Sequence, residues 1–136
     1  PEMRGGTANC SVTLSDEPIG SPLVTVPDVL VAMNQPSYDK FVDDVCEGGS
    51  IIVDSGLVGD VKEVEGVSTY AIPAAQMAED AGLQGLGNIV LVGKLWEVTH
   101  FCSRETLDAA IEKCVPPSKA ALIEKNKQAI QLGIEA

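Results

Sequence analysis

Apolar and polar positions along the first half of the chain form strand-like patterns around one helical stretch. Between residues 7 and 15 the two kinds alternate with a period of two, which predicts a strand with one face toward solvent. Residues 28–33 and 50–54 are short, mainly apolar runs, typical of parallel strands buried on both faces. Between these runs Pro36 is expected to begin a helix that ends before Gly48, with its apolar stripe on Tyr38, Phe41, Val42 and Val45.

The second half carries mostly helical patterns. Residues 57–66 are weakly patterned and predict a turn or a short edge strand, whereas residues 67–72 predict a full strand. Pro73 is expected to open a short helix that reaches about Ala81. Asn88 is expected to cap a helix over residues 89–98, which is apolar almost all round and therefore buried. Within that helix Gly93 would let another element pack closely.

Two further helices complete the expected chain. Ser103 is expected to cap the first, and the second follows Pro116-Pro117 and ends near Leu132. The order strand, helix, strand over residues 28–54 predicts a right-handed crossover between parallel strands. The expected fold class is therefore α/β, a three-layer α/β/α sandwich on a mixed, mostly parallel sheet, with residues 1–136 forming one domain.

The charge balance excludes several classes of partner. The chain has 9 Lys and Arg against 20 Asp and Glu, which gives a net charge of −11. An acidic surface of this kind repels phosphate backbones and anionic lipids, so we expect neither nucleic-acid nor membrane binding. Apolar stretches are also too short to cross a bilayer.

The four cysteines, Cys10, Cys46, Cys102 and Cys114, show no metal-binding spacing. None forms a C-x-x-C pair, and neither a zinc ribbon nor a ferredoxin-type cluster can be drawn from them. We expect four reduced thiols in a cytoplasmic protein and no metal site on this chain.

Arg4-Gly5-Gly6 is the sharpest local motif. Two glycines allow their N–H groups to surround an anion beside the Arg4 guanidinium, although the same residues also suit a plain turn into a strand. The motif is a candidate cofactor-binding loop, but it is not a phosphate-loop signature.

Polar residues that follow the buried strands are the second candidate site. Asn34, Gln35, Asp54 and Ser55 lie at the expected carboxyl ends of two parallel strands, the edge where ligands of open α/β sheets bind. Asn88 follows a glycine-rich turn at a helix start, which suits either an anion or a simple cap. We retain Asn34 and Asn88 as candidate cofactor contacts.

No pattern indicates catalysis by this chain alone. His100 is the only histidine, and the sequence places no nucleophile or orienting acid near it. Asp43-Asp44 and Glu79-Asp80 are typical of solvated helix faces. We therefore assign no catalytic residue.

The opening run and much of the remaining chain resemble one family. Residues 1–8, Pro-Glu-Met-Arg-Gly-Gly-Thr-Ala, are similar to the Gly-Pro-Glu-x-Arg-Gly-Gly loop of 2-oxoacid:ferredoxin oxidoreductase gamma subunits. Further stretches resemble that family in the same order, at residues 15–22, 27–35, 38–41, 48–55, 72–74 and 88–93. This collinearity is more specific than any single motif.

The resemblance implies a subunit that is inactive alone. Such a complex oxidatively decarboxylates a 2-oxoacid, forms an acyl-CoA and reduces ferredoxin, and 2-oxoglutarate is the favoured substrate. The resemblance implies alpha, beta and ferredoxin-like delta partners, which carry the thiamine diphosphate and the iron–sulfur clusters. The gamma subunit is expected to help close the active site and accommodate coenzyme A, and to dimerise when isolated.

The family pattern begins with a strand and a Gly-x-Gly-Gly-Gln-Gly loop that this sequence lacks. We therefore expect an N-terminally incomplete gamma-type domain whose missing strand belongs in the centre of the sheet. Two alternatives remain open at this point. One is a free-standing nucleotide- or CoA-binding module, and the other is an enzyme that works through a reactive cysteine.

Overall fold

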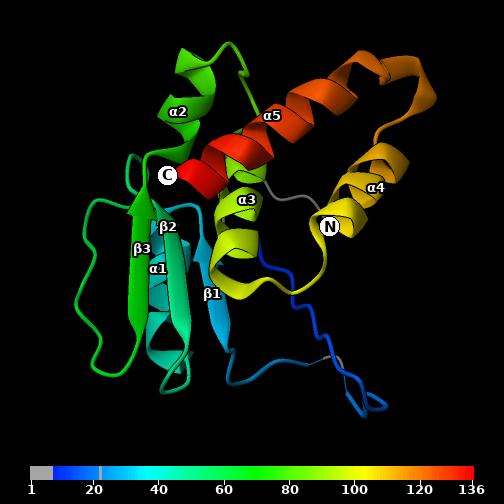
Figure 1. The fold of residues 1–136 in the computed structure, drawn as a ribbon. Coiled ribbons are helices and arrows are strands. Elements are labelled where there is room, and N and C mark those ends of the chain that lie inside the picture. Colours follow the sequence, from blue (N-terminus) through cyan, green and yellow to red (C-terminus); the bar gives the residue numbers. More distant parts are fainter. Residues whose placement is uncertain (1–7, 22) are drawn as a thin grey trace.

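Three parallel strands form the centre of the domain, in the order β1-β2-β3 (Figure 1). β1 is Val29–Ala32, β2 is Ser50–Asp54 and β3 is Ser68–Ile72, in a computed structural model that describes residues 8–21 and 23–136. Val31 lies beside Ile52 in the sheet register. β-branched residues recur in all three strands and suit a pleated, buried surface. The strands predicted at residues 28–33, 50–54 and 67–72 are confirmed.

One face of the sheet is covered by α1, Gln35–Phe41, and the short 3-10 helix Val42–Asp44. The predicted helix is confirmed, but its last turn tightens into the 3-10 form before the chain returns to β2. The core on this side combines residues of β1, α1, the 3-10 helix, β2 and the connecting segments, namely Ala32, Tyr38, Val42, Val45, Ile51, Val53 and Val58.

α3, Gly87–Thr99, lies against the other face, and α2, Ala74–Asp80, and α5, Ala121–Glu135, pack against α3. Ile52 of β2 packs here with Leu91 of α3, whereas its neighbour Ile51 packs under α1. Successive side chains of a strand point to opposite faces, so the three central residues of β2, 51–53, are all apolar and fill both cores. The α/β class and the three-layer arrangement are confirmed.

The closest helix crossing joins α3 to α5. A β-carbon on Gly93 would collide with the carbonyl oxygen of Ile130, and one on Gly133 with the carbonyl oxygen of Val90. The two backbones can meet only because both positions lack a side chain. The close approach predicted at Gly93 is confirmed.

α4, Arg104–Cys114, and the first half of α5 form a helical hairpin that projects from the sheet (Figure 1). The Ser103 hydroxyl accepts a hydrogen bond from the Thr106 N–H at 3.1 Å, so the predicted cap is confirmed. The 3-10 turn Pro117–Lys119 connects the two helices. None of the helices in the described ranges combines the length and apolar character needed to cross a membrane.

The N-terminal arm, which is residues 8–21 and 23–28, contains neither helix nor strand and leads into β1 (Figure 1). The strand predicted at residues 7–15 is therefore wrong over its described part, residues 8–15. A period-two pattern identifies which side chains share a face, but a strand also needs a backbone partner. Among the described residues, no backbone hydrogen bond joins residues 8–15 to another segment. Both strand pairs among the described residues are parallel, so the described sheet is parallel rather than mixed.

β1 is an edge of the described sheet. Its Val31 side chain is 38% exposed, so the prediction that this run is buried on both faces is wrong for β1. The cause is topological, because β2 has a strand on each side and β1 has one on only one side.

Candidate functional site

The candidate site is the edge of the sheet where all three parallel strands end. Asn34 follows β1, Asp54 closes β2, and Ala74 begins α2 after β3. Because the strands are parallel, these residues share one edge, as the sequence predicts.

Asp54 organises this edge. Its side chain is 1% exposed, and each carboxylate oxygen accepts one backbone hydrogen bond. Oδ1 accepts from the Gly56 N–H at 2.9 Å and Oδ2 accepts from the Ala75 N–H at 2.8 Å. The first bond shapes the turn after β2, and the second places a negative charge at the start of α2, where the helix dipole stabilises it. Asp54 is therefore a support of the edge, with both oxygens engaged.

Asn34 begins α1. Its Oδ1 accepts the Ser37 N–H at 2.9 Å, the geometry of a helix N-cap, and the residue is exposed at the strand-end edge. The neighbouring Gln35 binds the backbone of Asp60 twice, donating from Nε2 to its carbonyl and accepting its N–H at Oε1, both at 2.9 Å. This pair ties the loop after β2 to α1.

Asn88 lies at the same edge on the opposite face. The backbone of Gly87 packs against that of Ala75, so the first turn of α3 meets the first turn of α2. The prediction that Asn88 caps α3 is wrong. Leu86 occupies the N-cap position and Asn88 is the exposed second residue of the helix. The helix begins where the turn from Leu83 to Leu86 closes, because the Leu86 carbonyl accepts the N–H of Val90. The capping preference of the Asn88 side chain did not set this boundary.

The edge thus combines two exposed amides with a rigid support. Asn34 and Asn88 belong to helices on opposite faces, and the Asp54 turn lies at the strand end between these layers. The third candidate, Arg4-Gly5-Gly6, falls outside the described residues.

A shallow hollow lies beside α1, with a volume of about 520 Å³. It is lined by Tyr38, Asp39, Val42 and residues 59–62. The Tyr38 hydroxyl accepts the Lys62 N–H at 3.0 Å, and the Asp43 carboxylate binds the Lys62 ammonium and raises its pKa. Sequence reasoning missed this hollow, because Tyr38 reads only as part of the apolar stripe.

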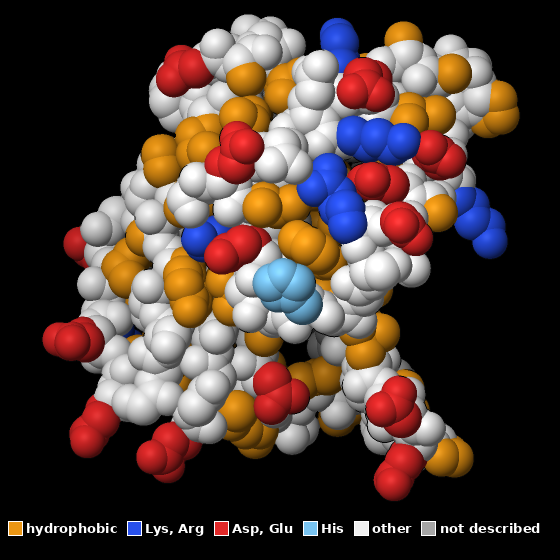
Figure 2. Space-filling view, viewed as in Figure 1, with side chains coloured by type: hydrophobic (Ala, Val, Ile, Leu, Met, Phe, Trp, Pro, Cys, Tyr) orange, Lys and Arg blue, Asp and Glu red, His pale blue; other side chains and the backbone are white. Residues whose placement is uncertain are grey.

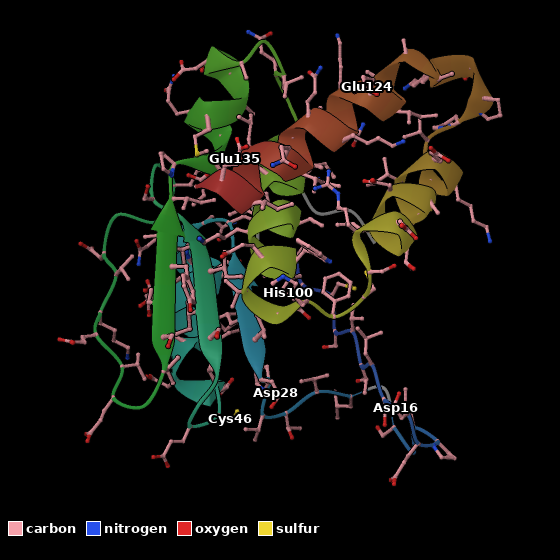
Figure 3. All side chains as sticks on the ribbon, in the orientation of Figure 1. Asp16, Asp28, Cys46, His100, Glu124 and Glu135 are labelled. Carbon is pink, nitrogen blue, oxygen red and sulfur yellow. The ribbon has the colours of Figure 1, made fainter. Side chains whose placement is uncertain are left out.

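His100 and the cysteines lie apart from this edge. His100, labelled in Figure 3, ends α3, and its ring packs against that of Trp96 at a tilt of 50°, with the ring centroids 4.5 Å apart. Cys46 donates a hydrogen bond to the Asp28 carboxylate at 3.4 Å, near the start of the strands. That hydrogen bond, with burial and the adjacent charge, raises the pKa of the Cys46 thiol.

Neither arrangement creates a reactive centre. A raised pKa keeps the Cys46 thiol protonated, which is the opposite of what an activated nucleophile needs. Within residues 8–21 and 23–136 no group of three or more His, Cys, Asp or Glu side chains could hold a metal ion. The strand-end edge can therefore form hydrogen bonds through the exposed amides of Asn34 and Asn88, at positions that the Asp54 hydrogen bonds support.

Comparison with protein families matches the whole chain, residues 1–136, to the model described as "Pyruvate ferredoxin/flavodoxin oxidoreductase". The 2-oxoglutarate synthase subunit KorC of Methanocaldococcus jannaschii is 42% identical over 99% of this chain and 72% of its own length. KorC of Methanothermobacter marburgensis is 38% identical over 99% and 74%. The ketoisovalerate oxidoreductase subunit VorA of Methanothermobacter thermautotrophicus is 38% identical over 99% of this chain but 28% of its own length.

Solved structures that resemble this chain are also oxoacid:ferredoxin oxidoreductases. The gamma subunit of a keto/oxoacid ferredoxin oxidoreductase from Geobacter sulfurreducens superposes with a TM-score of 0.72 at 32% identity, over 79% of this chain and 62% of that one. The 2-oxoglutarate:ferredoxin oxidoreductase of Magnetococcus marinus, solved with 2-oxoglutarate, coenzyme A and succinyl-CoA bound, has a TM-score of 0.67 at 25% identity. That match covers 78% of this chain and 19% of the longer one.

Proposed function

Because this chain belongs to the pyruvate ferredoxin/flavodoxin oxidoreductase family, we propose that it is the gamma subunit of a multisubunit 2-oxoacid:ferredoxin oxidoreductase. Such a complex converts a 2-oxoacid and coenzyme A into acyl-CoA and carbon dioxide, and passes two electrons to an acceptor. The observation that carries the proposal is the collinear match to KorC at 42% identity over 99% of the chain. The KorC relatives are named as subunits of 2-oxoglutarate synthases, so we propose 2-oxoglutarate as the preferred substrate.

Within this complex we propose that the strand-end edge forms one wall of the coenzyme A site. In support, Asn34 and Asn88 expose amide groups that can donate and accept hydrogen bonds, and the buried Asp54 turn keeps the edge rigid. The residues that form this edge in the structure contribute amides and backbone N–H groups, and none of them is a lysine or an arginine. The cations that neutralise the coenzyme A phosphates would therefore come from Arg4 or from a neighbouring subunit.

Thiamine diphosphate and iron–sulfur clusters would be held by the partner subunits in this proposal. The described part of the chain contains no cluster of metal-ligating side chains that could hold iron. This subunit would then bind and orient the coenzyme, close the site against water, and leave the bond-making steps to its alpha, beta and delta partners.

Reconstitution tests the proposal. The chain alone, given 2-oxoglutarate, coenzyme A, thiamine diphosphate and oxidised ferredoxin, should show no turnover. Addition of the alpha, beta and delta subunits should produce succinyl-CoA and reduced ferredoxin. Turnover by the isolated chain, or full activity of the partners without it, would contradict the assignment. A similar assay with pyruvate and branched-chain 2-oxoacids ranks the substrates.

A further inference from the structure

The loop that follows β2, residues 55–67, contains neither helix nor strand, but it is held at fixed points. The N–H groups of Leu57 and Val58 both donate to the Asp54 carbonyl oxygen, at 3.1 and 2.8 Å, so the loop leaves the strand through a closed turn. Val58 is 1% exposed and packs in the core beneath α1. These contacts fix residues 55–58 from the side of β2.

Gln35, the first residue of α1, fixes the loop from the other side. Its Oε1 accepts the Asp60 N–H and its Nε2 donates to the Asp60 carbonyl oxygen, both at 2.9 Å. Through these two bonds the side-chain amide gives Asp60 the pairing that a neighbouring strand would otherwise supply. Nε2 also donates to Asp39, one turn further along α1, at 2.8 Å, which keeps the amide oriented. Both ends of the Gln35 amide are therefore engaged within the chain.

Tyr38 binds the same loop a second time, two residues beyond Asp60. Its hydroxyl accepts the Lys62 N–H at 3.0 Å and donates to the Lys62 carbonyl oxygen at 3.3 Å. Tyr38 is 1% exposed and lies in the core beneath α1. Because the side chain is buried, its influence on a ligand at the strand-end edge would pass through the loop.

The charge of the loop differs between its two parts. Residues 55–59, Ser-Gly-Leu-Val-Gly, carry no charge and begin at the strand-end edge, next to the strand that Asn34 follows. Residues 60–65 contain three acidic side chains and one lysine. Figure 1 draws the loop from the strand ends down the left of the sheet, and Figure 2 shows acidic side chains along the same border. The second part repels an anionic ligand such as coenzyme A, so the uncharged first part is the one suited to face it.

We infer that Gln35 is a positioning residue for the coenzyme A wall. The coenzyme contacts residues 55–57 of the loop as well as the Asn34 amide, and Gln35 holds the loop where both contacts form together. Interactions in a binding site depend on placement to within a fraction of an ångström, so the residue that fixes the loop controls affinity without touching the ligand. This inference rests on the proposed function, and it adds a loop and a positioning residue to the two exposed amides.

The test compares Gln35→Ala with Gln76→Ala in the reconstituted complex. Gln76 is a matched control because its Nε2 also donates to an aspartate four residues further along, Asp80, at 2.8 Å, and within the described residues it forms no hydrogen bond to a loop. Gln35→Ala should raise the KM for coenzyme A by about threefold or more, the size expected for one lost hydrogen bond, and leave the KM for 2-oxoglutarate unchanged. Gln76→Ala should leave both KM values unchanged.

Tyr38→Phe separates positioning from direct contact. It removes both bonds to Lys62 but leaves Gln35 and the exposed amides unaltered, so it should also raise the KM for coenzyme A. Amide hydrogen exchange on the isolated chain gives a reading that does not depend on activity. The Asp60 N–H should lose protection in Gln35→Ala and the Lys62 N–H in Tyr38→Phe, whereas both should stay protected in Gln76→Ala.

The outcomes separate this inference from the proposed function. Absence of turnover from the complete unsubstituted complex would remove both. An unchanged KM for coenzyme A in Gln35→Ala, with the Asp60 N–H open to exchange, would remove the positioning role and leave the subunit assignment standing. A raised KM in Gln35→Ala but not in Tyr38→Phe would assign Gln35 to direct contact with the coenzyme and overturn the inference. An equal rise in the KM values for coenzyme A and 2-oxoglutarate would indicate a general loss of the subunit and overturn it as well.

Discussion

The buried carboxylate of Asp54 accepts the backbone N–H of Ala75 at 2.8 Å, and so joins the end of β2 to the first turn of α2. The same side chain accepts the Gly56 N–H through its other oxygen. Ala75 also packs closely against Gly87, so Asp54 binds the part of the edge where α2 meets the start of α3.

Replacement of Asp54 by Ala should lower the free energy of unfolding by about 2–4 kcal/mol, because it leaves two backbone donors without their partner in a buried site. Urea unfolding followed by circular dichroism measures the change. Asp80→Asn, at an exposed position of α2, is the control, and its free energy of unfolding should stay within about 0.5 kcal/mol of the unsubstituted chain. A loss at Asp54 no larger than that of the control would show that the edge is held by other contacts.

Gly133→Ala should be strongly destabilising, by about 3 kcal/mol or more, because a β-carbon would collide with the Val90 carbonyl oxygen and force α5 away from α3. Gly59→Ala is the control, since nothing lies within 4 Å of a β-carbon built there. Thermal unfolding should show a large drop in Tm for the first variant and almost none for the second. Equal Tm values would mean that the two helices do not cross at this distance.

Asp28→Asn should make Cys46 more reactive. The Asp28 carboxylate accepts the thiol hydrogen bond and opposes the thiolate, and both effects raise the pKa of Cys46. With the amide in place the pKa falls, more thiolate is present at pH 8, and alkylation by iodoacetamide accelerates. The pH profile of the Cys46 rate should move to lower pH, as followed by mass spectrometry of the modified peptides. The exposed Cys114 provides the internal reference, and its rate should not change.

Asn88→Ala should separate ligand binding from folding. Asn88 is exposed and caps nothing, so the stability of the isolated chain should change by less than about 0.5 kcal/mol. If Asn88 contacts coenzyme A in the reconstituted complex, loss of one hydrogen bond should raise the KM for coenzyme A by about 3- to 10-fold and leave the KM for the 2-oxoacid unchanged. An unaltered KM for coenzyme A would remove Asn88 from the proposed wall.

Asn34→Asp offers a complementary measurement at the other amide. An aspartate can still accept the N-cap hydrogen bond from the Ser37 N–H, so α1 should remain stable. Asn34→Ala removes this bond and should lower the free energy of unfolding by about 1 kcal/mol. The added negative charge should repel the coenzyme A phosphates and raise the KM for coenzyme A. Equal coenzyme affinity in Asn34→Asp and the unsubstituted complex would argue against contact at this position.

The sequence alone determined those features whose cause is local. The apolar run at residues 50–54 identified β2, the stripe through Tyr38 and Val42 identified α1, and Ser103 marked the start of α4. In each case the signal and its structural consequence lie within one or two turns of chain, so periodicity and capping chemistry suffice. The positions of Asn34 and Asp54 at one edge also followed, since parallel strands end together.

Tertiary structure alone decided the features that depend on a partner distant in sequence. Residues 8–15 carry a strand pattern without a strand, because the described chain offers their backbone no hydrogen-bonding neighbour. Val31 is half-exposed because β1 has a neighbour on one side only. Asn88 lost the N-cap position to Leu86 through the closure of a turn, and Asp54 became a support when the fold brought Ala75 to it. A side-chain pattern specifies what a segment can do, but pairing and burial are settled only when the other segment is in place.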